Sequence, residues 1–395
     1  MERMILQVCN PHKICYKRAM QCDKTTAKTK VECHMKYVAK NRSSFIQKIR
    51  DFFVHADFLE VETPIMTPIP GMEPHLTPFE SRLNFPSVSN SKTADLPVYL
   101  NTSPELQMKK LLGSPEGFDK IFNITKVFRN GEMDGPLHNP EFTMIEWYRK
   151  NADYKDLMKD CENLILELVR INRLKTIGAD ETQNNLAVSQ TAAPQIPSLT
   201  YQSETINLST PWPRFTTNEL FIKYCGLDLL ENQEFATFKK NAEAKNLDTN
   251  GCENWDDIYF KIFLNNIEPE LTKLNQPIFI YDYPASQAAL AKKSSSNQFF
   301  AERFELYIKG IELANAFSEL TDSKEQLARL LEEQNLRKTM GKTILPIDEE
   351  FLSALEAITT PTAGIALGLD RLIMLLLDKK SIEEVLLFPM NKMAK

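Results

Sequence analysis

Two arginines far apart in the chain lie among residue types that bind phosphate groups. Arg129 ends an apolar run and is followed by Asn130, Gly131, a polar loop and a second apolar run, which together predict a β-hairpin. Arg371 follows the small-residue segment Gly364–Gly368, at the expected start of a helix. The planar guanidinium group donates paired hydrogen bonds, a geometry that suits phosphate. Taken singly, either arginine could equally be an exposed side chain that pairs with a surface carboxylate.

Carboxylates with apolar neighbours form a second set of candidates. Glu312 and Glu319 lie seven residues apart on one predicted strand, and magnesium prefers hard oxygen ligands. The pair therefore predicts a site for a divalent ion between phosphates, with two solvated carboxylates as the alternative. Glu105 follows Ser103 and Pro104, a sequence that is also an ordinary helix start, because proline fits the first helical turn.

Strand and helix patterns along the chain predict an α+β fold. Several strands follow one another without a helix long enough for a parallel crossover, so we expect a large, mostly antiparallel sheet flanked by helices. The first helix is expected to begin at Ser44, which has capping-box spacing to Gln47. The expected strands are Leu59–Thr63, Val98–Asn101, Lys120–Phe128, Phe142–Arg149, Pro277–Tyr283, Phe304–Leu313 and Gly364–Gly368. The expected helices are Ser44–Asp57, Tyr154–Ile171, Asp322–Met340, Asp348–Ile358, Leu369–Leu377 and Ser381–Leu387.

We divide the chain into a basic N-terminal extension, residues 1–40, and one domain, residues 41–395. The extension holds nine Lys or Arg against three Asp or Glu, and we expect it to be poorly ordered or to precede a true start at Met35. Its four cysteines have irregular spacing, which argues against a zinc site. No charged residue occurs from Thr182 to Ser203, so we expect a flexible insertion over about 176–212, because such a segment buries too little apolar surface to offset its ordering entropy.

Composition excludes several classes of protein. The 395 residues are 43% apolar and 25% charged, a globular balance, with neither an apolar run long enough to cross a membrane nor a secretion signal. The seven cysteines form no CxxC pair, so we expect a reducing, cytoplasmic location. The net charge of −6 argues against a general nucleic-acid binder.

Together and in this order, these segments resemble the catalytic core of class II aminoacyl-tRNA synthetases. The resemblance covers roughly residues 44–175 and 213–388. It implies an antiparallel-sheet fold, a homodimer, and AMP-forming activation of an amino acid with ATP and Mg²⁺. The similar segments are Leu59–Met66, the Arg129 hairpin and Gly364–Leu372 for the three motifs of the class, and Arg129-Asn130, His138–Phe142 and Glu312–Leu320 for its lysine-specific branch.

The resemblance implies a role for each candidate residue. Arg129 would bind the α-phosphate of ATP and Arg371 the distal phosphates, and with Glu312 they would be the catalytic residues. Glu105 and Glu319 would receive the two ammonium groups of the amino acid, since a desolvated ammonium needs a paired charge. The other implied contacts are Asn130, Gly131, Asn139, Leu313 and Gly368 to ATP, Ser103, Pro104 and Tyr148 to the amino acid, and Glu312 and Glu319 to Mg²⁺.

Two groups within the lysine-specific branch fit this sequence. One attaches lysine to tRNA, and the other attaches β-lysine to a lysine of translation elongation factor P. The first carries a five-stranded oligonucleotide-binding barrel before the core, which about 40 residues cannot form. Ser103, where tRNA ligases typically have alanine, is similar to the second group, as are Asn130–Met133, Glu146–Tyr148 and Pro284–Ala288. We therefore expect elongation factor P as acceptor and lysine or β-lysine as substrate, without tRNA; a lysyl-tRNA synthetase-type ligase lacking the anticodon-binding domain is the alternative.

Three features depart from the family. The segment before Met35 and the 176–212 insertion have no counterpart, and Ala316-Phe317-Ser318 stands where the family has Gly-Phe-His. Serine at that position is the choice typical of tRNA ligases, which leaves the fine substrate preference open. A catalytically inactive, partner-binding relative is a third hypothesis. Such proteins tend to lose their phosphate-binding arginines and metal-binding carboxylates, whereas this chain retains both.

Overall fold

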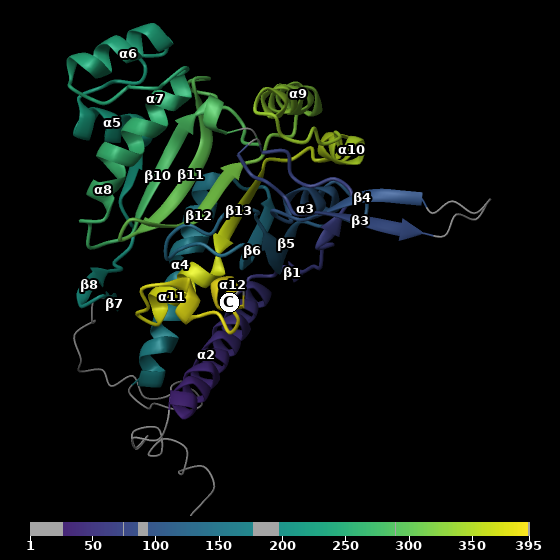
Figure 1. Ribbon diagram of the computed structural model, residues 1–395, viewed down its shortest axis with the longest axis vertical. Coiled ribbons are helices and arrows are strands. Elements are labelled where there is room, and N and C mark those ends of the chain that lie inside the picture. Colours follow the sequence, from purple (N-terminus) through teal and green to yellow (C-terminus); the bar gives the residue numbers. More distant parts are fainter. Residues whose placement is uncertain (1–26, 74, 86–93, 177–196, 289, 394–395) are drawn as a thin grey trace, which may run out of the picture.

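The computed structural model describes residues 27–73, 75–85, 94–176, 197–288 and 290–393, and its centre is an eight-stranded sheet (Figure 1). The strand order is β1-β5-β6-β13-β12-β11-β10-β9. Only the outer pairs β1–β5 and β9–β10 are parallel, so the predicted mostly antiparallel sheet is confirmed. The strands are β1 (Leu59–Glu60), β5 (Lys120–Phe128), β6 (Glu141–Lys150), β9 (Arg214–Thr216), β10 (Ile278–Pro284), β11 (Phe300–Ile308), β12 (Ile311–Ser318) and β13 (Thr362–Gly368).

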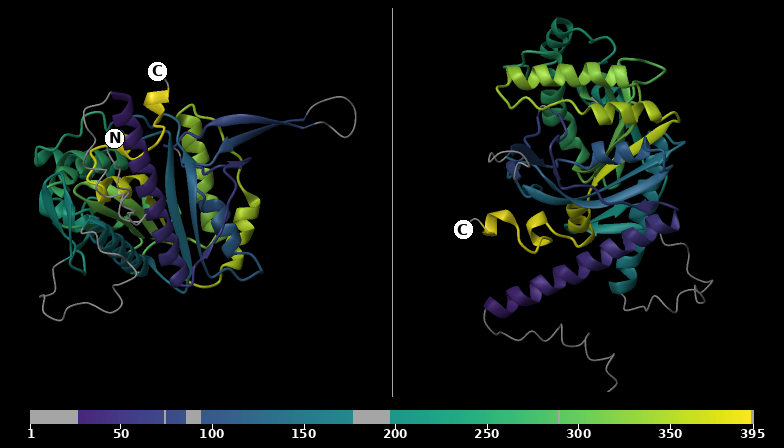
Figure 2. Two further views of the ribbon diagram at one scale, coloured as in Figure 1. Left: turned by 90° about the horizontal axis from the view of Figure 1, so that it is seen from below. Right: turned by 90° about the vertical axis from the view of Figure 1, so that its right-hand side faces the viewer.

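Helices cover both faces of this sheet (Figure 2). On one face lie α2 (Ala27–His55), α4 (Tyr154–Thr176) and α11 (Leu369–Leu376), where Phe53 of α2 stacks on Phe122 of β5 at 5.0 Å between ring centroids. On the other face lie α3 (Glu105–Leu112), α9 (Ser323–Thr339) and α10 (Glu349–Ala357), around a second apolar cluster that includes Tyr148. The functional side chains described below lie on this second face.

Two small sheets and a helical cluster complete the described fold. β2 (Met66–Thr67), β4 (Ala94–Leu100) and β3 (Glu80–Phe85) form one sheet, and β7 (Ser198–Tyr201) and β8 (Glu204–Asn207) form a hairpin. Beside β10, a separate apolar core joins α5 (Thr217–Cys225), α6 (Phe235–Ala244), α7 (Trp255–Ile262), the π-helix η2 (Phe263–Ile267) and α8 (Glu268–Leu271). The sequence patterns above did not predict these helices.

The predicted start of the first helix at Ser44 is wrong. Helix α2 begins at Ala27 and therefore includes residues 27–40 of the predicted extension, while residues 1–26 lie outside the described part of the chain. Tertiary contacts explain the difference. Val38 is buried, and Arg42 forms an ion pair of 2.6 Å with Asp370 at the start of α11. The zinc alternative involves Cys9, Cys15 and Cys22, which also lie outside the described residues, and Cys33, which lies in α2.

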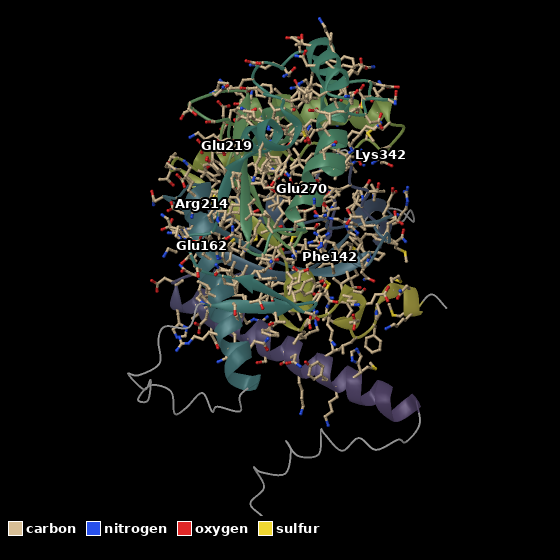
Figure 3. All side chains as sticks on the ribbon, turned by 90° about the vertical axis from the view of Figure 1, so that its left-hand side faces the viewer. Phe142, Glu162, Arg214, Glu219, Glu270 and Lys342 are labelled. Carbon is tan, nitrogen blue, oxygen red and sulfur yellow. The ribbon has the colours of Figure 1, made fainter. Side chains whose placement is uncertain are left out.

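The predicted insertion is ordered in its second part. Residues 177–196 lie outside the described part, but 197–212 contain the β7–β8 hairpin and return to the core. The backbone N–H of Trp212 donates to Glu162 of α4 at 2.8 Å, and Arg214 pairs with the same carboxylate at 3.6 Å (Figure 3). Trp212 itself is 1% exposed, so apolar burial in this stretch does offset its ordering entropy.

Two further observations bear on the predictions. The expected helix Ser381–Leu387 is only a short 3-10 turn, η4 (Ile382–Glu384). None of the helices in the described ranges has the length and apolar character that a membrane crossing needs.

Candidate active site

A cleft of about 330 Å³ opens where β6, β12 and β13 meet the start of α11. Among its lining residues are six of the predicted ones: Arg129, Asn139, Glu312, Leu313, Gly368 and Arg371. The structure thus brings together two arginines that are 242 positions apart in the sequence. Asn130 and Gly131 do not line the cleft and are exposed beyond the end of β5.

The guanidinium of Arg129 lines this cleft, and one of its nitrogen atoms has no hydrogen-bond partner among the described residues. Its backbone N–H donates to the Pro140 carbonyl oxygen at 2.9 Å, which fixes the residue at the base of the β5–β6 hairpin. The guanidinium carbon lies 5.3 Å from the centroid of the Phe142 ring. Nη1 of Arg129 lies 3.7 Å from Oε1 of Glu132. Within the described part of the chain, the buried Nε has no hydrogen-bond partner. A ligand oxygen would supply one.

Arg371 is held by three protein groups at the opposite wall. Its guanidinium donates to the carbonyl oxygens of Glu312 at 2.8 Å and Leu137 at 3.3 Å. Its third contact is Nε2 of His138 at 3.1 Å. Nδ1 of His138 lies 2.7 Å from the Asp134 carbonyl oxygen. Because a carbonyl oxygen only accepts, Nδ1 carries the proton and Nε2 accepts from Arg371.

A β-bulge turns Glu312 towards the cleft. Tyr307 of β11 pairs with Glu312 and Leu306 pairs with Ala314, which leaves Leu313 as one extra residue in β12. Leu313 and Ala314 are consequently both buried in the core beneath the sheet. Because of this extra residue, Glu312 and Asn315 lie on the same face of β12 although they are three positions apart, and both line the cleft.

Glu305 is the carboxylate that faces Glu312, and sequence reasoning missed it. Burial, and next the charge of Glu305, raise the pKa of Glu312 to about 7, although Arg371, Arg303 and Arg129 oppose the shift. Glu305 accepts hydrogen bonds from Tyr283 at 2.6 Å and Tyr307 at 2.7 Å. Lys309 and Gly310 both have positive φ and form a two-residue hairpin turn between β11 and β12. This turn places Glu305 and Glu312 on one face of the two strands, so the short hairpin was the sequence feature that could have indicated Glu305.

The binding of one metal ion by both Glu312 and Glu319 stays a prediction. The two residues lie at opposite ends of β12, and seven residues of strand span about 23 Å. Glu319 instead contacts the ammonium of Lys109. No cluster of three or more metal-binding side chains occurs in the described ranges. Glu305 is paired with Arg303 at 2.6 Å and does not line the cleft, so Glu312 is the carboxylate that fits an ion also held by a ligand's oxygens, as Mg²⁺ commonly is.

Further along the same face, a buried acidic pocket surrounds Lys109. Lys109 of α3 is 0% exposed, and its Nζ lies 2.6 Å from Oε1 of Glu105 and also contacts Glu319. Burial alone would lower the pKa of Lys109, but the charges of Glu105 and Glu319 outweigh it and raise the value. The ring of Phe317 lies 5.7 Å from the same ammonium. The chain thus places its own ammonium between two carboxylates that were predicted to bind the substrate.

The pocket nevertheless contains more acid groups than Lys109 can neutralise. Tyr148 donates to Oε2 of Glu146 at 2.8 Å, while Oε1 of Glu146 and Oε1 of Glu319 are buried without a partner among the described residues. Burial, then the charge of Glu105, raises the pKa of Glu146 well above its usual range. Burial is also the main cause that raises the pKa of Glu319 to about 8. Lys109 is shared by Glu105 and Glu319, and Glu146 has no counter-charge among the described residues.

Gly364 of β13 makes room in this pocket. A Cβ at this position would collide with the Tyr148 ring and the Glu319 carboxylate. Gly364 pairs with Tyr148 and Gly368 pairs with Met144, so pocket and cleft lie four residues apart on the same two strands, about 13 Å. This spacing lets one ligand of moderate length reach both.

The other predicted residues lie around the acidic pocket and the cleft. Pro104 is the residue before the first turn of α3, and Ser103 lines a smaller cavity next to Glu105. Asn139 lines the cleft, but its amide already donates to the Glu141 carbonyl and accepts from Met390 N–H at 3.0 Å. Asn139 therefore shapes the cleft rather than offering a free polar group.

Comparison with known proteins agrees with this arrangement. The chain matches the family described as "tRNA synthetases class II (D, K and N)" over residues 18–392. It is 36% identical to a lysine–tRNA ligase of Magnetococcus marinus over 92% of this chain, and it spans only 65% of that protein's length. It is 38% identical to an elongation factor P–(R)-beta-lysine ligase of Proteus mirabilis, over 89% of this chain and 94% of that protein. A ligase of the same name from Mannheimia succiniciproducens is 37% identical over 89% of this chain and 94% of its own length.

The sheet order, the two arginines in one cleft and these matches agree on a single assignment. The chain belongs to the class II tRNA synthetase family, in the group that contains the lysine enzymes.

Proposed function

We propose that this protein is an ATP-dependent ligase that activates lysine or β-lysine as an aminoacyl-adenylate and transfers it to a lysine side chain of translation elongation factor P. The observation that carries the proposal is the shared platform of β6 and β13, on which a guanidinium-lined cleft lies beside an acidic pocket with uncompensated charge. Phosphate groups fit the first, and an amino acid with two ammonium groups fits the second.

In the first step, the substrate carboxylate attacks the α-phosphorus of ATP. A carboxylate–phosphorus bond forms, the bond to the β-phosphate oxygen breaks, and pyrophosphate leaves. The substrate carboxylate is already ionised near neutral pH, so no protein base is needed. Arg129 binds the α-phosphate and Arg371 the distal phosphates, and both stabilise the charge of the transition state. Gly368 and Leu313 border the nucleotide, while the contacts of Asn130 and Gly131 with ATP remain what the resemblance implies, since both residues lie outside the cleft.

Glu312 would hold a magnesium ion together with the phosphates of ATP. The ion would neutralise charge on the phosphates during the displacement. The raised pKa of Glu312 supports this placement, because a bound cation favours the ionised form of a buried carboxyl group. Glu319 belongs to the acidic pocket instead.

The acidic pocket binds the amino acid. The distal ammonium lies against the free oxygens of Glu146 and Glu319, with Tyr148 beside them. The ammonium nearer the carboxylate lies towards Glu105, Pro104 and Ser103. Lys109 holds Glu105 and Glu319 in place and keeps the unliganded pocket from containing three unpaired carboxylates.

In the second step, the neutral ε-amine of the acceptor lysine attacks the carbonyl carbon of the adenylate. An amide bond forms, AMP leaves, and the amine gives up a proton. The relatives matched over 94% of their length are named as ligases of elongation factor P, which favours a protein acceptor. The sequence identity to a lysine–tRNA ligase is similar, at 36%, so tRNA is the second candidate acceptor.

Pyrophosphate exchange tests the activation step. The protein with ATP, Mg²⁺ and either lysine isomer should exchange label between pyrophosphate and ATP. Arg129→Ala should reduce this exchange about 30- to 1,000-fold, since one such contact contributes roughly 2–4 kcal/mol to the barrier. Arg82→Ala, on the exposed strand β3, is the matched control. Full exchange by a folded Arg129→Ala protein would refute the α-phosphate role.

A further inference from the structure

Next to the acidic pocket lies a cavity of about 20 Å³ that the mechanism above does not use. Its polar lining includes Ser103 and Glu105, already assigned to the amino acid, and three more carboxylates, Glu73, Glu333 and Asp348. Apolar side chains, among them Leu330 and Phe351, form much of the remaining wall. A space of this volume holds one group about the size of a water molecule, and an ammonium group is of that size.

One oxygen of the Glu73 carboxylate is buried, while the residue as a whole is half-buried. Its Oε2 has no hydrogen bond within the described part of the chain. The backbone of the same residue is fixed, because Arg337 donates to the Glu73 carbonyl oxygen at 3.1 Å. A Cβ at Gly71 would collide with the carboxylate, so the side chain folds back over its own loop and does not extend into solvent. Burial and then the charge of Glu105 raise the pKa of Glu73.

Glu333 of α9 lines the cavity together with the carboxylates of Glu73, Glu105 and Asp348. Burial, followed by the charges of Glu73 and Glu105, raises its pKa to about 8. No ion pair in the described ranges includes Glu73 or Glu333, and the guanidinium of nearby Arg337 donates to the carbonyl oxygens of Glu73, Leu76 and Thr343. Glu105 and Asp348 are paired with Lys109 and Lys110, whereas Glu73 and Glu333 receive no cation from the described part of the chain.

The position of Glu73 indicates which substrate group would enter. Glu73 lies close enough to both Arg129 and Glu105 for their charges to act on it. The substrate carboxylate must approach the α-phosphate held by Arg129, so the cavity lies near the carboxylate end of the amino acid. The distal ammonium is bound at the other end, at Glu146 and Glu319.

We propose that Glu73, supported by Glu333, binds the ammonium group nearest the substrate carboxylate and thereby selects amino acids that carry two ammonium groups. This inference rests on the proposed activation of lysine or β-lysine. Glu73 contacts the substrate, and Glu333 acts through the shared cavity. An amino acid that carries only the distal ammonium would form no ion pair with Glu73 or Glu333.

Amide variants test the proposal in the full chain. Glu73→Gln keeps the size of the side chain and removes its charge. We expect the KM for lysine and for β-lysine in pyrophosphate exchange to rise about 10- to 100-fold, the loss of a charge-assisted contact. The KM for ATP, and the inhibition constant of 6-aminohexanoate against lysine, should stay within about twofold, because neither ligand carries that ammonium. Glu333→Gln should give a smaller change of the same kind, and Glu116→Gln, exposed after α3, should give none.

Three outcomes would overturn the proposal. An unchanged KM for both lysine isomers would show that Glu73 does not contact the substrate. A joint loss of affinity for lysine, 6-aminohexanoate and ATP would show a structural role only. Absence of exchange by the unsubstituted protein with either isomer would overturn the proposed function and, with it, this subsite, whereas either of the first two results beside an active unsubstituted protein overturns the subsite alone.

Discussion

Individual side chains of the site derive their properties from burial beside like charges. Glu312 faces Glu305 across a strand pair, and Glu146 faces Glu105 and Glu319. In each case burial is the largest cause of the raised pKa, and the neighbouring carboxylate adds to it. Such groups favour a bound cation, because a cation removes the repulsion that the folded chain imposes.

The pKa of Glu312 leads to a pH-dependent prediction. At pH 6, below its pKa of about 7, Glu312 is largely protonated in the free protein. Binding of Mg²⁺ and ATP requires the carboxylate, so a proton should leave, and affinity should rise from pH 6 to pH 8. Calorimetry in two buffers of different ionisation enthalpy measures this release. Glu312→Gln should abolish the proton release, and equal release by both proteins would contradict the assignment.

The sequence predicted those individual site residues that lie beside a recognisable local pattern. Arg129, Glu312 and Arg371 lie next to recognisable hairpin and strand-helix patterns, and they line one cleft. Lys109 and Glu73 carry no such signal. Their importance depends on partners about 210 and 260 positions away, Glu319 and Glu333.

Secondary-structure elements position the site through a few tight contacts. Gly364 on β13 has no side chain where Tyr148 and Glu319 lie close together. Gly364→Ala should therefore displace the amino-acid pocket and reduce lysine activation at least tenfold, while ATP binding at the cleft about 13 Å away persists. Exchange kinetics and ATP titration on the same protein measure both. Normal lysine kinetics in Gly364→Ala would contradict the pocket assignment.

Helix α2 is tied to the site by one buried ion pair. Arg42 contacts Asp370 at 2.6 Å, and the same carboxylate accepts from the Thr143 N–H at 2.8 Å, next to Arg371. Arg42→Ala should lower the free energy of unfolding by about 3–5 kcal/mol, because it leaves Asp370 buried and unpaired. Arg50→Ala on the same helix, whose partner Glu60 is exposed, should cost less than about 1 kcal/mol. Denaturant unfolding compares the two, and equal effects would refute the anchoring role.

Local patterns predicted most of the central strands and failed where tertiary packing decides. The expected strand Lys120–Phe128 has the bounds of β5, and Asp322 caps α9 as its side chain accepts from Lys324 and Glu325 N–H. Ser44 carries a capping signal inside a continuous helix, since Val38 and Arg42 bind the preceding turns to the core. Helix α5 does have a capping box from Thr216 to Glu219, a signal that was present and overlooked.

At the scale of the whole molecule, an exposed apolar surface at the first motif favours self-association. Leu59, Ile65 and Met66 are 55%, 42% and 47% exposed, although they are large and apolar. We predict a homodimer through this surface, and Ile65→Glu should shift it to monomer in analytical ultracentrifugation. A monomeric unsubstituted protein, or a dimer unaffected by Ile65→Glu, would contradict this interface. Among the described residues, Cys161, Cys225 and Cys252 are buried free thiols.

The proposed reaction of this protein is the activation of a lysine isomer and its transfer to a protein acceptor. It is tested most directly by competition between acceptors: the protein, ATP, Mg²⁺ and β-lysine or lysine are incubated with equimolar elongation factor P and lysine tRNA, and the intact mass of each acceptor is measured. We predict that elongation factor P gains the mass of one lysyl group while the tRNA stays unchanged. Charged tRNA beside unmodified elongation factor P would contradict the account.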